Sequence, residues 1–195
     1  MNEEVRSVLI LIFISLLIVG VVYGAGTDNV DRRTVRVFDL ERYMGDWYEI
    51  ARYDHRFERG LMEVRATYRL RDDGRVDVLN SGTSLHGERR KSARGKARLT
   101  GQPGRLQVSF FWFFYSDYNV MELGDDYDWA LVGSRSAKYL WIMSRTPRLP
   151  VPTLNRILRL AERRGYKTSG LVFVDQPAEE GLAARGGVRG GAARL

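Results

Sequence analysis

Thiol and imidazole side chains are common choices for nucleophilic catalysis and for binding transition metals. The chain has 195 residues, no cysteine and two histidines, His55 and His86. It therefore cannot form a disulfide, a thiolate nucleophile or a zinc site with cysteine ligands. The histidines are far apart, and neither has a second ligand at helical or hairpin spacing. We expect no metal site and no bound cofactor.

The sequence motifs of common hydrolases are also missing. There is no Gly-x-Ser-x-Gly nucleophile elbow, and no Ser, His and Asp have the spacing of a catalytic triad. We therefore predict that the protein is not an enzyme. Turnover of an ester, abolished by one substitution, would contradict this prediction.

The overall charge is strongly positive. Lys and Arg number 31 against 24 Asp and Glu, which gives a formal charge of +7. Such a chain favours anionic partners, for which lipid head groups and nucleic acid are the two classes to consider. Because the basic residues are scattered rather than striped, we expect no nucleic acid partner.

The two ends of the chain differ from its middle in composition. Residues Val8 to Val22 are almost entirely apolar, so residues 1–26 are a signal peptide or a membrane anchor, and residues 27–36 a linker. Small residues near Gly24 favour cleavage, but the weakly charged N-terminus leaves both interpretations open. At the other end, residues 177–195 are rich in Gly, Ala and Arg and are expected to be disordered.

The middle of the chain has the alternation of β-strands. Val64, Ala66, Tyr68 and Leu70 alternate with polar residues, and Asp72-Asp73-Gly74 then predicts a hairpin turn. Eight such runs occur between Trp47 and Arg145, which favours an all-β fold. An eight-stranded up-and-down antiparallel barrel and an open sandwich both fit, because sequence spacing does not reveal whether a sheet closes.

Two further segments complete this domain. Leu154, Ile157, Leu158 and Ala161 have helical spacing and predict a C-terminal α-helix packed outside the strands, which Gly165 can end. The run from Phe110 to Tyr115 is wholly aromatic, and alternation along one strand would place three rings on each face. The outer rings would pack against the helix or, alternatively, touch a membrane or a second subunit.

Three motifs carry a resemblance to a known family. The stretch from Tyr43 to Gly60, with Gly45-Asp46-Trp47, closely resembles bacterial lipocalins of the outer-membrane lipoprotein type. Asp126-Tyr127 resembles the second motif of that family, and Leu140 to Pro147 the third. The resemblance covers residues 37–176 and implies the closed barrel, with Arg145 packed across Trp47 at its closed end. Members of this type carry an acylated cysteine after the signal sequence, which this chain lacks.

The resemblance also implies a ligand site. Matching positions in eukaryotic relatives place Tyr68, Asn80 and Trp141 in the barrel interior, and period-two alternation adds Ala66, Val78 and Tyr139. Apolar walls would hold an acyl chain, while the Tyr and Asn side chains would bond a polar group. Four basic residues lie near the expected mouth: Arg52, His55, Arg56 and Arg59. They either attract an anionic head group of the ligand or simply belong to a solvated loop.

Together these features predict a carrier of single-chain lipids, either a lysophospholipid or a fatty acid. We expect it to be exported to the cell envelope, in the periplasm or at the outer membrane, as a monomer or homodimer in contact with a membrane surface. The alternative is a structural or interaction protein of the envelope that carries no lipid.

Overall fold

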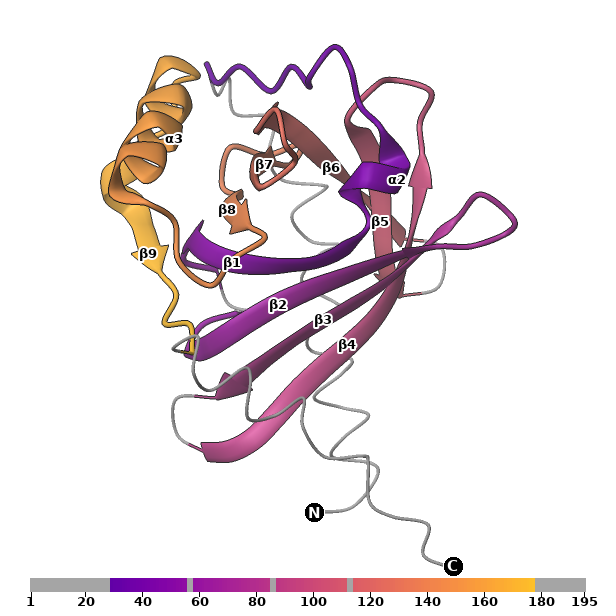
Figure 1. Ribbon diagram of the computed structural model, residues 1–195, viewed down its shortest axis with the longest axis horizontal. Coiled ribbons are helices and arrows are strands. Elements are labelled where there is room, and N and C mark those ends of the chain that lie inside the picture. The colour runs from indigo at the N-terminus through magenta and orange to yellow at the C-terminus, as the bar shows by residue number, and fades with distance from the viewer. Residues whose placement is uncertain (1–28, 56–57, 85–86, 112–113, 178–195) are drawn as a thin grey trace, which may run out of the picture.

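The computed structural model describes residues 29–55, 58–84, 87–111 and 114–177 (Figure 1). The expected signal peptide or anchor and the expected disordered tail, beyond residue 177, lie outside these ranges, as do Arg56 and His86. Within the described ranges, no helix has the length and apolar character needed to cross a membrane.

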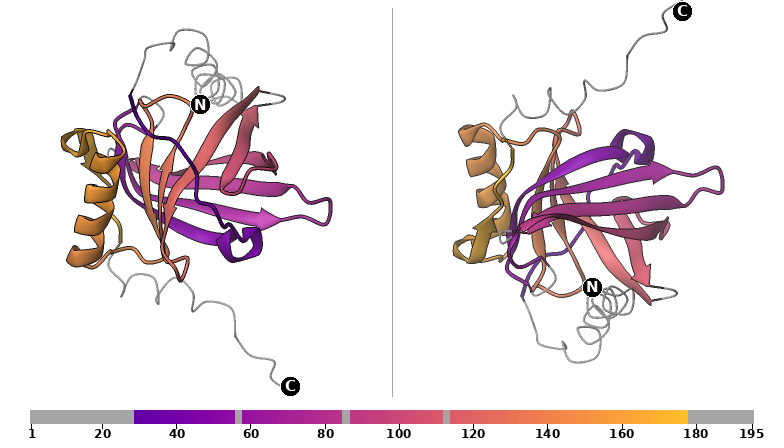
Figure 2. Two further views of the ribbon diagram at one scale, coloured as in Figure 1. Left: turned by 90° about the horizontal axis from the view of Figure 1, so that it is seen from above. Right: turned by 90° about the horizontal axis from the view of Figure 1, so that it is seen from below.

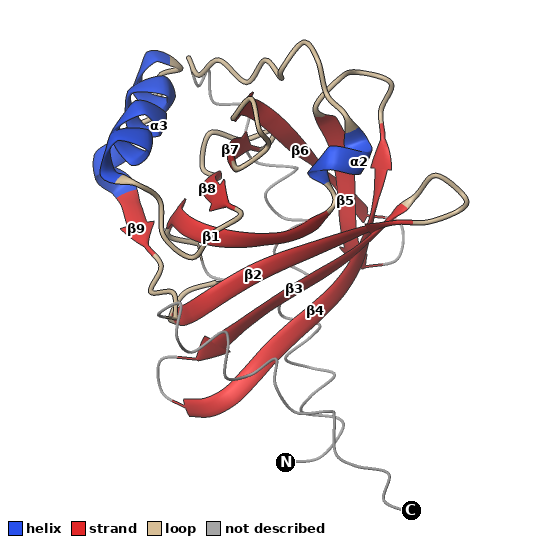
Figure 3. Ribbon diagram, in the orientation of Figure 1, coloured by secondary structure: helices blue, strands red, loops and turns tan. Residues whose placement is uncertain are grey.

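The described elements are mostly strands (Figure 3). Their bounds are α2 Leu40–Tyr43, β1 Gly45–Tyr53, β2 Leu61–Leu70, β3 Val76–Ser84, β4 Gly87–Leu99, β5 Arg105–Phe111, β6 Phe114–Leu123, β7 Trp129–Gly133, β8 Leu140–Ser144, α3 Val151–Arg163, a 3₁₀ helix Thr168–Gly170, and β9 Leu171–Phe173.

The strands form a closed antiparallel barrel. Each strand from β1 to β7 pairs with the next one in sequence, and β8 pairs with β1. This closure confirms the eight-stranded up-and-down barrel and excludes the open sandwich. The predicted hairpin joins β2 and β3, and Gly74 at its turn has a φ of 75°, a conformation that glycine adopts without steric cost. That turn projects away from α3, on the side where α2 lies (Figure 2).

The C-terminal helix packs outside the barrel, as predicted. Ile157 and Ala161 of α3 are fully buried against the outer face of β7 and β8, where Leu131 and Ile142 are also fully buried. The following strand, β9, pairs with β1 from Ala51 to Tyr53, beyond the part of β1 that pairs with β2.

The aromatic run does not form one strand. β5 ends at Phe111 and β6 begins at Phe114, so the run spans the connection between two strands, and residues 112–113 lie outside the described ranges. The rings of Phe111 and Phe114 stack across the hairpin with centroids 6.3 Å apart. The expectation of three rings on each face of a single strand was therefore wrong, because alternation does not continue through a turn.

One end of the barrel is closed by α2 and by the side chain of Arg145. The Arg145 guanidinium lies 3.9 Å from the ring centroid of Trp47, which is fully buried. It also donates hydrogen bonds to the backbone carbonyls of Arg42 at 2.7 Å, Asp46 at 2.9 Å and Tyr127 at 3.2 Å. A single side chain thus joins α2, the start of β1 and the connection before β7.

Two residues near Arg145 have positive φ angles, Gly45 and Tyr127. Gly45 has a φ of 93°, and a Cβ atom at this position would lie 3.3 Å from the nearer Arg145 nitrogen. Tyr127 has a φ of 59°, which is unusual for a tyrosine. Its hydroxyl accepts a hydrogen bond from the Asp39 backbone N–H at 2.7 Å, and Arg42 lies over its ring. These contacts offset the cost of the strained backbone.

Replacing Arg145 by alanine should destabilise the fold strongly. Loss of the cation–π contact and of three charged hydrogen bonds should lower the free energy of unfolding by about 3 kcal/mol. Lysine should recover only part of this, because an ammonium cannot bond three carbonyls in one plane. Urea unfolding measures the effect, with alanine at the exposed Arg148 as the control; equal stability of the two alanine variants would contradict the assignment.

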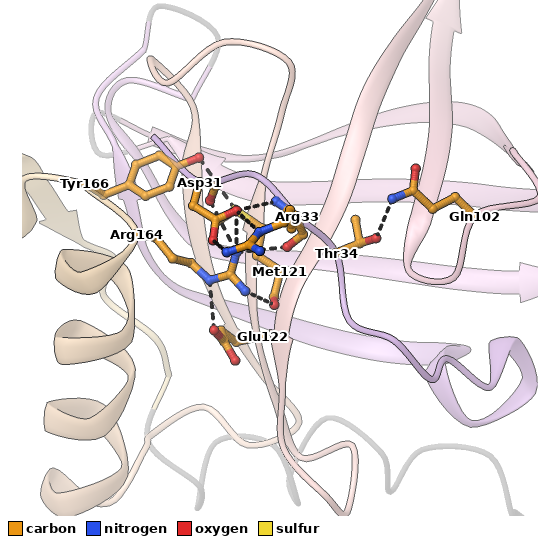
Figure 4. A network of polar contacts seen from close by, with 8 residues as sticks. All are labelled: Asp31, Arg33, Thr34, Gln102, Met121, Glu122, Arg164 and Tyr166. Atoms are coloured by element: carbon orange, nitrogen blue, oxygen red, sulfur yellow. Dashed lines mark hydrogen bonds and ion pairs between the residues drawn. The ribbon is translucent and has the colours of Figure 1, made fainter. Parts of the chain in front are cut away.

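The described part of the segment before α2, which falls within the expected linker 27–36, is hydrogen-bonded to the rest of the molecule. Arg164, just after α3, donates to the backbone carbonyls of Arg33 at 2.8 Å and Met121 at 2.7 Å, and to the Glu122 carboxylate at 2.8 Å (Figure 4). The Asp31 backbone N–H donates back to the Arg164 carbonyl at 2.8 Å. Residues 29–35 are therefore tied to both α3 and β6.

Alanine at Arg164 should release this segment without unfolding the barrel. The amides of Asp31 and Val35, which are bonded to Arg164 and Val120, should lose protection against hydrogen exchange by about tenfold or more. Peptide-resolved exchange measured by mass spectrometry tests this, with the exposed Arg163 changed to alanine as the control. Unchanged protection of residues 29–35 would show that Arg164 does not hold the segment.

Candidate functional site

The inward side chains of the strands form one apolar cluster. Among the predicted ligand residues, Ala66, Tyr68 and Val78 are buried members of this cluster, and Trp141 packs against it. Tyr68 lies directly opposite Val78 in the pairing of β2 with β3. The predicted alternation therefore places these side chains inside the barrel.

Asn80 is a polar residue on the same inner wall. It pairs with Ala66 on β2 and with Ala93 on β4, so it shares the inward face of these strands. Its side-chain oxygen Oδ1 is buried and has no hydrogen-bond partner within the described residues. A buried amide oxygen without a partner costs free energy, which a donor on a bound molecule would recover.

Tyr139 and Trp141 form a second group at the start of β8. Their rings stack with centroids 5.8 Å apart and planes at 11°. The His55 ring lies 5.4 Å from Tyr139 and 5.5 Å from Trp141, measured between centroids. Four of the six predicted ligand residues thus lie on β2 and β3, and the other two lie near His55, with Trp141 also packed against the apolar cluster.

A cluster of charged side chains lies next to Trp141. Arg52 donates to the Glu49 carboxylate at 2.7 Å and lies 3.8 Å from the Glu58 carboxylate. Glu58 accepts from the indole N–H of Trp141 at 3.2 Å and lies 3.2 Å from the Nε2 atom of His55. Arg52 also donates to the backbone carbonyl of Glu58. The charged ends of these residues are thus almost removed from water.

Burial shifts the protonation of this charged cluster. Loss of hydration raises the pKa of Glu49 well above its ordinary value, and the nearby Glu58 carboxylate adds to the rise. Burial also lowers the pKa of His55, against the attraction of Glu58. Two carboxylates therefore face one guanidinium and an imidazole that favours its neutral form.

Two of the basic residues predicted at the mouth, Arg52 and Arg59, have different surroundings. Arg52 is buried and paired with Glu49 and Glu58, so it is not an exposed receptor for an anionic head. Arg59 is exposed and forms an ion pair with Asp54 at 2.8 Å. Sequence reasoning missed both glutamates of the cluster. Period-two alternation from Trp47 already points Glu49 inward and was the available signal.

Three tyrosine hydroxyls meet deeper in the barrel. Tyr68 donates to the Tyr118 hydroxyl at 3.0 Å, and the hydroxyls of Tyr43 and Tyr118 are 2.8 Å apart. Burial raises the pKa of Tyr68 to about 12 and also raises the pKa values of Tyr43 and Tyr118. Sequence reasoning identified only Tyr68, because the partners come from α2 and β6. Together the hydroxyls form a polar spot in an otherwise apolar interior.

The described residues do not bring together three His, Asp or Glu side chains in an arrangement suited to a metal ion.

The buried tyrosines predict a loss of stability in alkali. The pKa of Tyr68 is near 10 in the unfolded chain and about 12 in the folded protein. The contribution of Tyr68 to the free energy of unfolding is therefore intact below pH 10 and is lost as the pH rises toward 12. The loss from Tyr68 alone amounts to about 3 kcal/mol. Urea unfolding at pH 9 and pH 11 should show a smaller difference for Tyr68→Phe than for the wild type. Tyr115→Phe, on the outer surface, is the control; equal pH dependence of all three proteins would contradict the assignment.

Comparison with known proteins agrees with this architecture. A family model described as a lipocalin-like domain matches residues 38–176. The outer membrane lipoprotein Blc of Escherichia coli (strain K12) is 48% identical over 145 residues, which cover 73% of this chain and 82% of the relative. Outer membrane lipoprotein Blc of Vibrio cholerae is 43% identical, over 74% of this chain and 86% of that protein.

The fold is also similar to solved structures. Lobster apocrustacyanin A1 superposes with a TM-score of 0.60 at 18% identity, over 72% of this chain and 81% of that one. At this identity the structural match supports only the assignment of the fold. Membership of a family rests on the family model and on the bacterial relatives. With its closed barrel, external helix and Arg145 packed on Trp47, the chain belongs to the lipocalin family.

Proposed function

We propose that the protein binds a single-chain lipid, a lysophospholipid or a fatty acid, inside the barrel and carries it within the cell envelope. Lipocalins generally bind small hydrophobic molecules rather than catalyse reactions. Its bacterial relatives are named outer membrane lipoproteins, which supports an exported location. Contact with a membrane surface would then give the carrier access to its lipid.

The observation that carries this proposal is the buried Oδ1 atom of Asn80. It lies on the inner face that Ala66 and Val78 share, where apolar contacts would hold an acyl chain. This oxygen can accept a hydrogen bond from the glycerol hydroxyl of a lysophospholipid or from the carboxyl group of a protonated fatty acid. The ligand would thus supply the hydrogen bond that the described residues do not.

The inward positions beside Asn80 are small. Ala93 and Ala97 of β4 face the interior opposite Asn80 and Val76. Each buried methylene contributes about 0.8 kcal/mol, so six or more enclosed methylenes can support micromolar binding after the costs of association. This favours a lipid with one chain, because two chains are hard to enclose within eight strands.

A second candidate function is a structural or interaction role in the envelope without a lipid. The observation in its favour is that Arg52 is already paired within the barrel, with Glu49 and Glu58. A delipidated protein that takes up no lipid but captures a protein partner would select this function.

Binding should depend on the Asn80 side chain. Delipidated protein would be titrated with a fluorescent fatty acid, and the probe displaced by oleate or by 1-oleoyl-lysophosphatidylethanolamine. Asn80→Leu should raise the dissociation constant of the better ligand by about tenfold, the value of one hydrogen bond. Leu79→Asn changes the neighbouring residue on the outward face of β3 and should leave binding unchanged.

Two results would count against these assignments. Failure of the wild type to bind the probe or either lipid would overturn the carrier function itself. Normal binding by Asn80→Leu, with the fold intact by circular dichroism, would overturn the role of Asn80 and leave the carrier function standing.

A further inference from the structure

The outer surface of β4 carries a row of positive charges, although we expected the basic residues to be scattered. Ala93 and Ala97 occupy inward positions on this strand, so the residues between them point outward. The outward positions from one end of the row to the other are Arg90, Ser92, Arg94, Lys96 and Arg98. Four of these five positions are therefore cationic, and Arg94 and Arg98 are exposed.

Two described acidic residues near this row form ion pairs with arginines outside it. Asp77 lies opposite Lys96 on β3, but its ion-pair partner is Arg71, at 3.5 Å. Asp117 on β6 forms an ion pair with Arg105 at 2.9 Å. Among the described residues, no carboxylate forms an ion pair with Arg94, Lys96 or Arg98. The positive charge of the row is therefore available to an anionic partner.

Aromatic and apolar side chains accompany the charges. The Arg98 guanidinium lies 4.2 Å and the Lys96 ammonium 5.9 Å from the ring centroid of Tyr115 on β6. Leu79, which pairs with Arg94, has 37% of its surface exposed on the same side. Cations interleaved with a tyrosine and an aliphatic side chain match the boundary between lipid head groups and acyl chains.

The described helices leave this surface uncovered. α3 packs on the outer face of β7 and β8, which lie across the barrel from β4 in the strand order. In Figure 1, α3 stands beside β9 at the upper left, whereas β4 runs along the lower edge of the barrel.

We propose that the β4 face, defined as Leu79, Arg94, Lys96, Arg98 and Tyr115, docks on an anionic phospholipid bilayer. Charge complementarity selects this partner, because anionic lipid surfaces attract clustered Lys and Arg side chains. The inference deepens the proposed function, since a carrier held against a bilayer meets the lipids that it collects. Docking and cargo binding can nevertheless be measured separately.

The absence of cysteine from the sequence makes one test direct. Ser92→Cys introduces a single thiol in the middle of the cationic row, and Asn155→Cys introduces one at an exposed position on α3. The full-length chain, labelled at either position with an environment-sensitive fluorophore, would be added to vesicles that contain nitroxide-labelled lipid. Vesicles of phosphatidylcholine would be compared with vesicles that also contain phosphatidylglycerol.

The fluorophore at Ser92→Cys should be strongly quenched on vesicles that contain phosphatidylglycerol and less on vesicles of phosphatidylcholine alone. The fluorophore at Asn155→Cys should be quenched little on either kind of vesicle. Added salt should reduce the quenching, because exposed charges are screened. This readout reports which face meets the bilayer even if the N-terminal segment anchors the chain. Equal quenching at the two positions, or quenching that ignores lipid charge, would overturn the proposal.

Charge substitutions provide a matched control. Arg94→Gln, Lys96→Gln and Arg98→Gln together should weaken charge-dependent docking by about tenfold or more, as followed by the Ser92→Cys probe. Removing the same charge from α3 by changing Arg156, Arg159 and Arg163 to Gln should weaken it much less. A larger effect of the α3 substitutions would overturn the assignment. Both variants should displace the fluorescent fatty acid normally, so failed docking is distinguishable from failed cargo binding.

Discussion

The structure depends on a constraint at the closed end of the barrel, where chain segments distant in sequence must meet without leaving polar groups unpaired. The Arg145 guanidinium satisfies this constraint by bonding the carbonyls of Arg42, Asp46 and Tyr127 while it stacks on Trp47. Burial of the guanidinium costs hydration free energy, and this cost lowers the pKa of Arg145. The three carbonyl acceptors and the indole ring offset it. Fixing this end positions the strands whose inner faces form the site.

The interior beyond this closure has three kinds of polar group. The tyrosine hydroxyls bond one another, and the charged residues around Arg52 are paired among themselves. Asn80 differs, because its Oδ1 atom has no partner within the described residues. The polar groups that satisfy one another stabilise the barrel, whereas under the proposed function the Asn80 oxygen would accept a hydrogen bond from the ligand. This difference separates residues that maintain the fold from the residue that we assign to recognition.

Local patterns were sufficient to predict most of the fold. Alternation in β2, the turn glycine at Gly74 and the helical spacing around Ile157 each depend on neighbouring residues, and each is confirmed. Closure of the sheet depends on long-range pairing, and only the resemblance to a family indicated it. The aromatic run was misread because a turn interrupts it between Phe111 and Phe114.

The site was harder to predict than the fold. Inward alternation placed residues such as Tyr68 and Val78 on the inner wall. It could not show that Arg52 is paired with Glu58, because Glu58 reaches it from the connection between two strands. A β-bulge between Glu49 and Ala51 also shifts the register of β1, so that Glu49 and Arg52 both lie opposite inward residues of β8. Ion pairs between distant residues and β-bulges depend on the tertiary structure, so the alternation of residue types along the sequence does not predict them.

Native mass spectrometry of the protein purified without detergent tests most directly whether the barrel holds a lipid. If the barrel carries one single-chain lipid, the spectrum should show a species heavier than the polypeptide by the mass of that lipid, which dissociates on activation and is regained when delipidated protein is incubated with the lipid. A spectrum that shows only the bare polypeptide, both as purified and after incubation with oleate or a lysophospholipid, would contradict the carrier function.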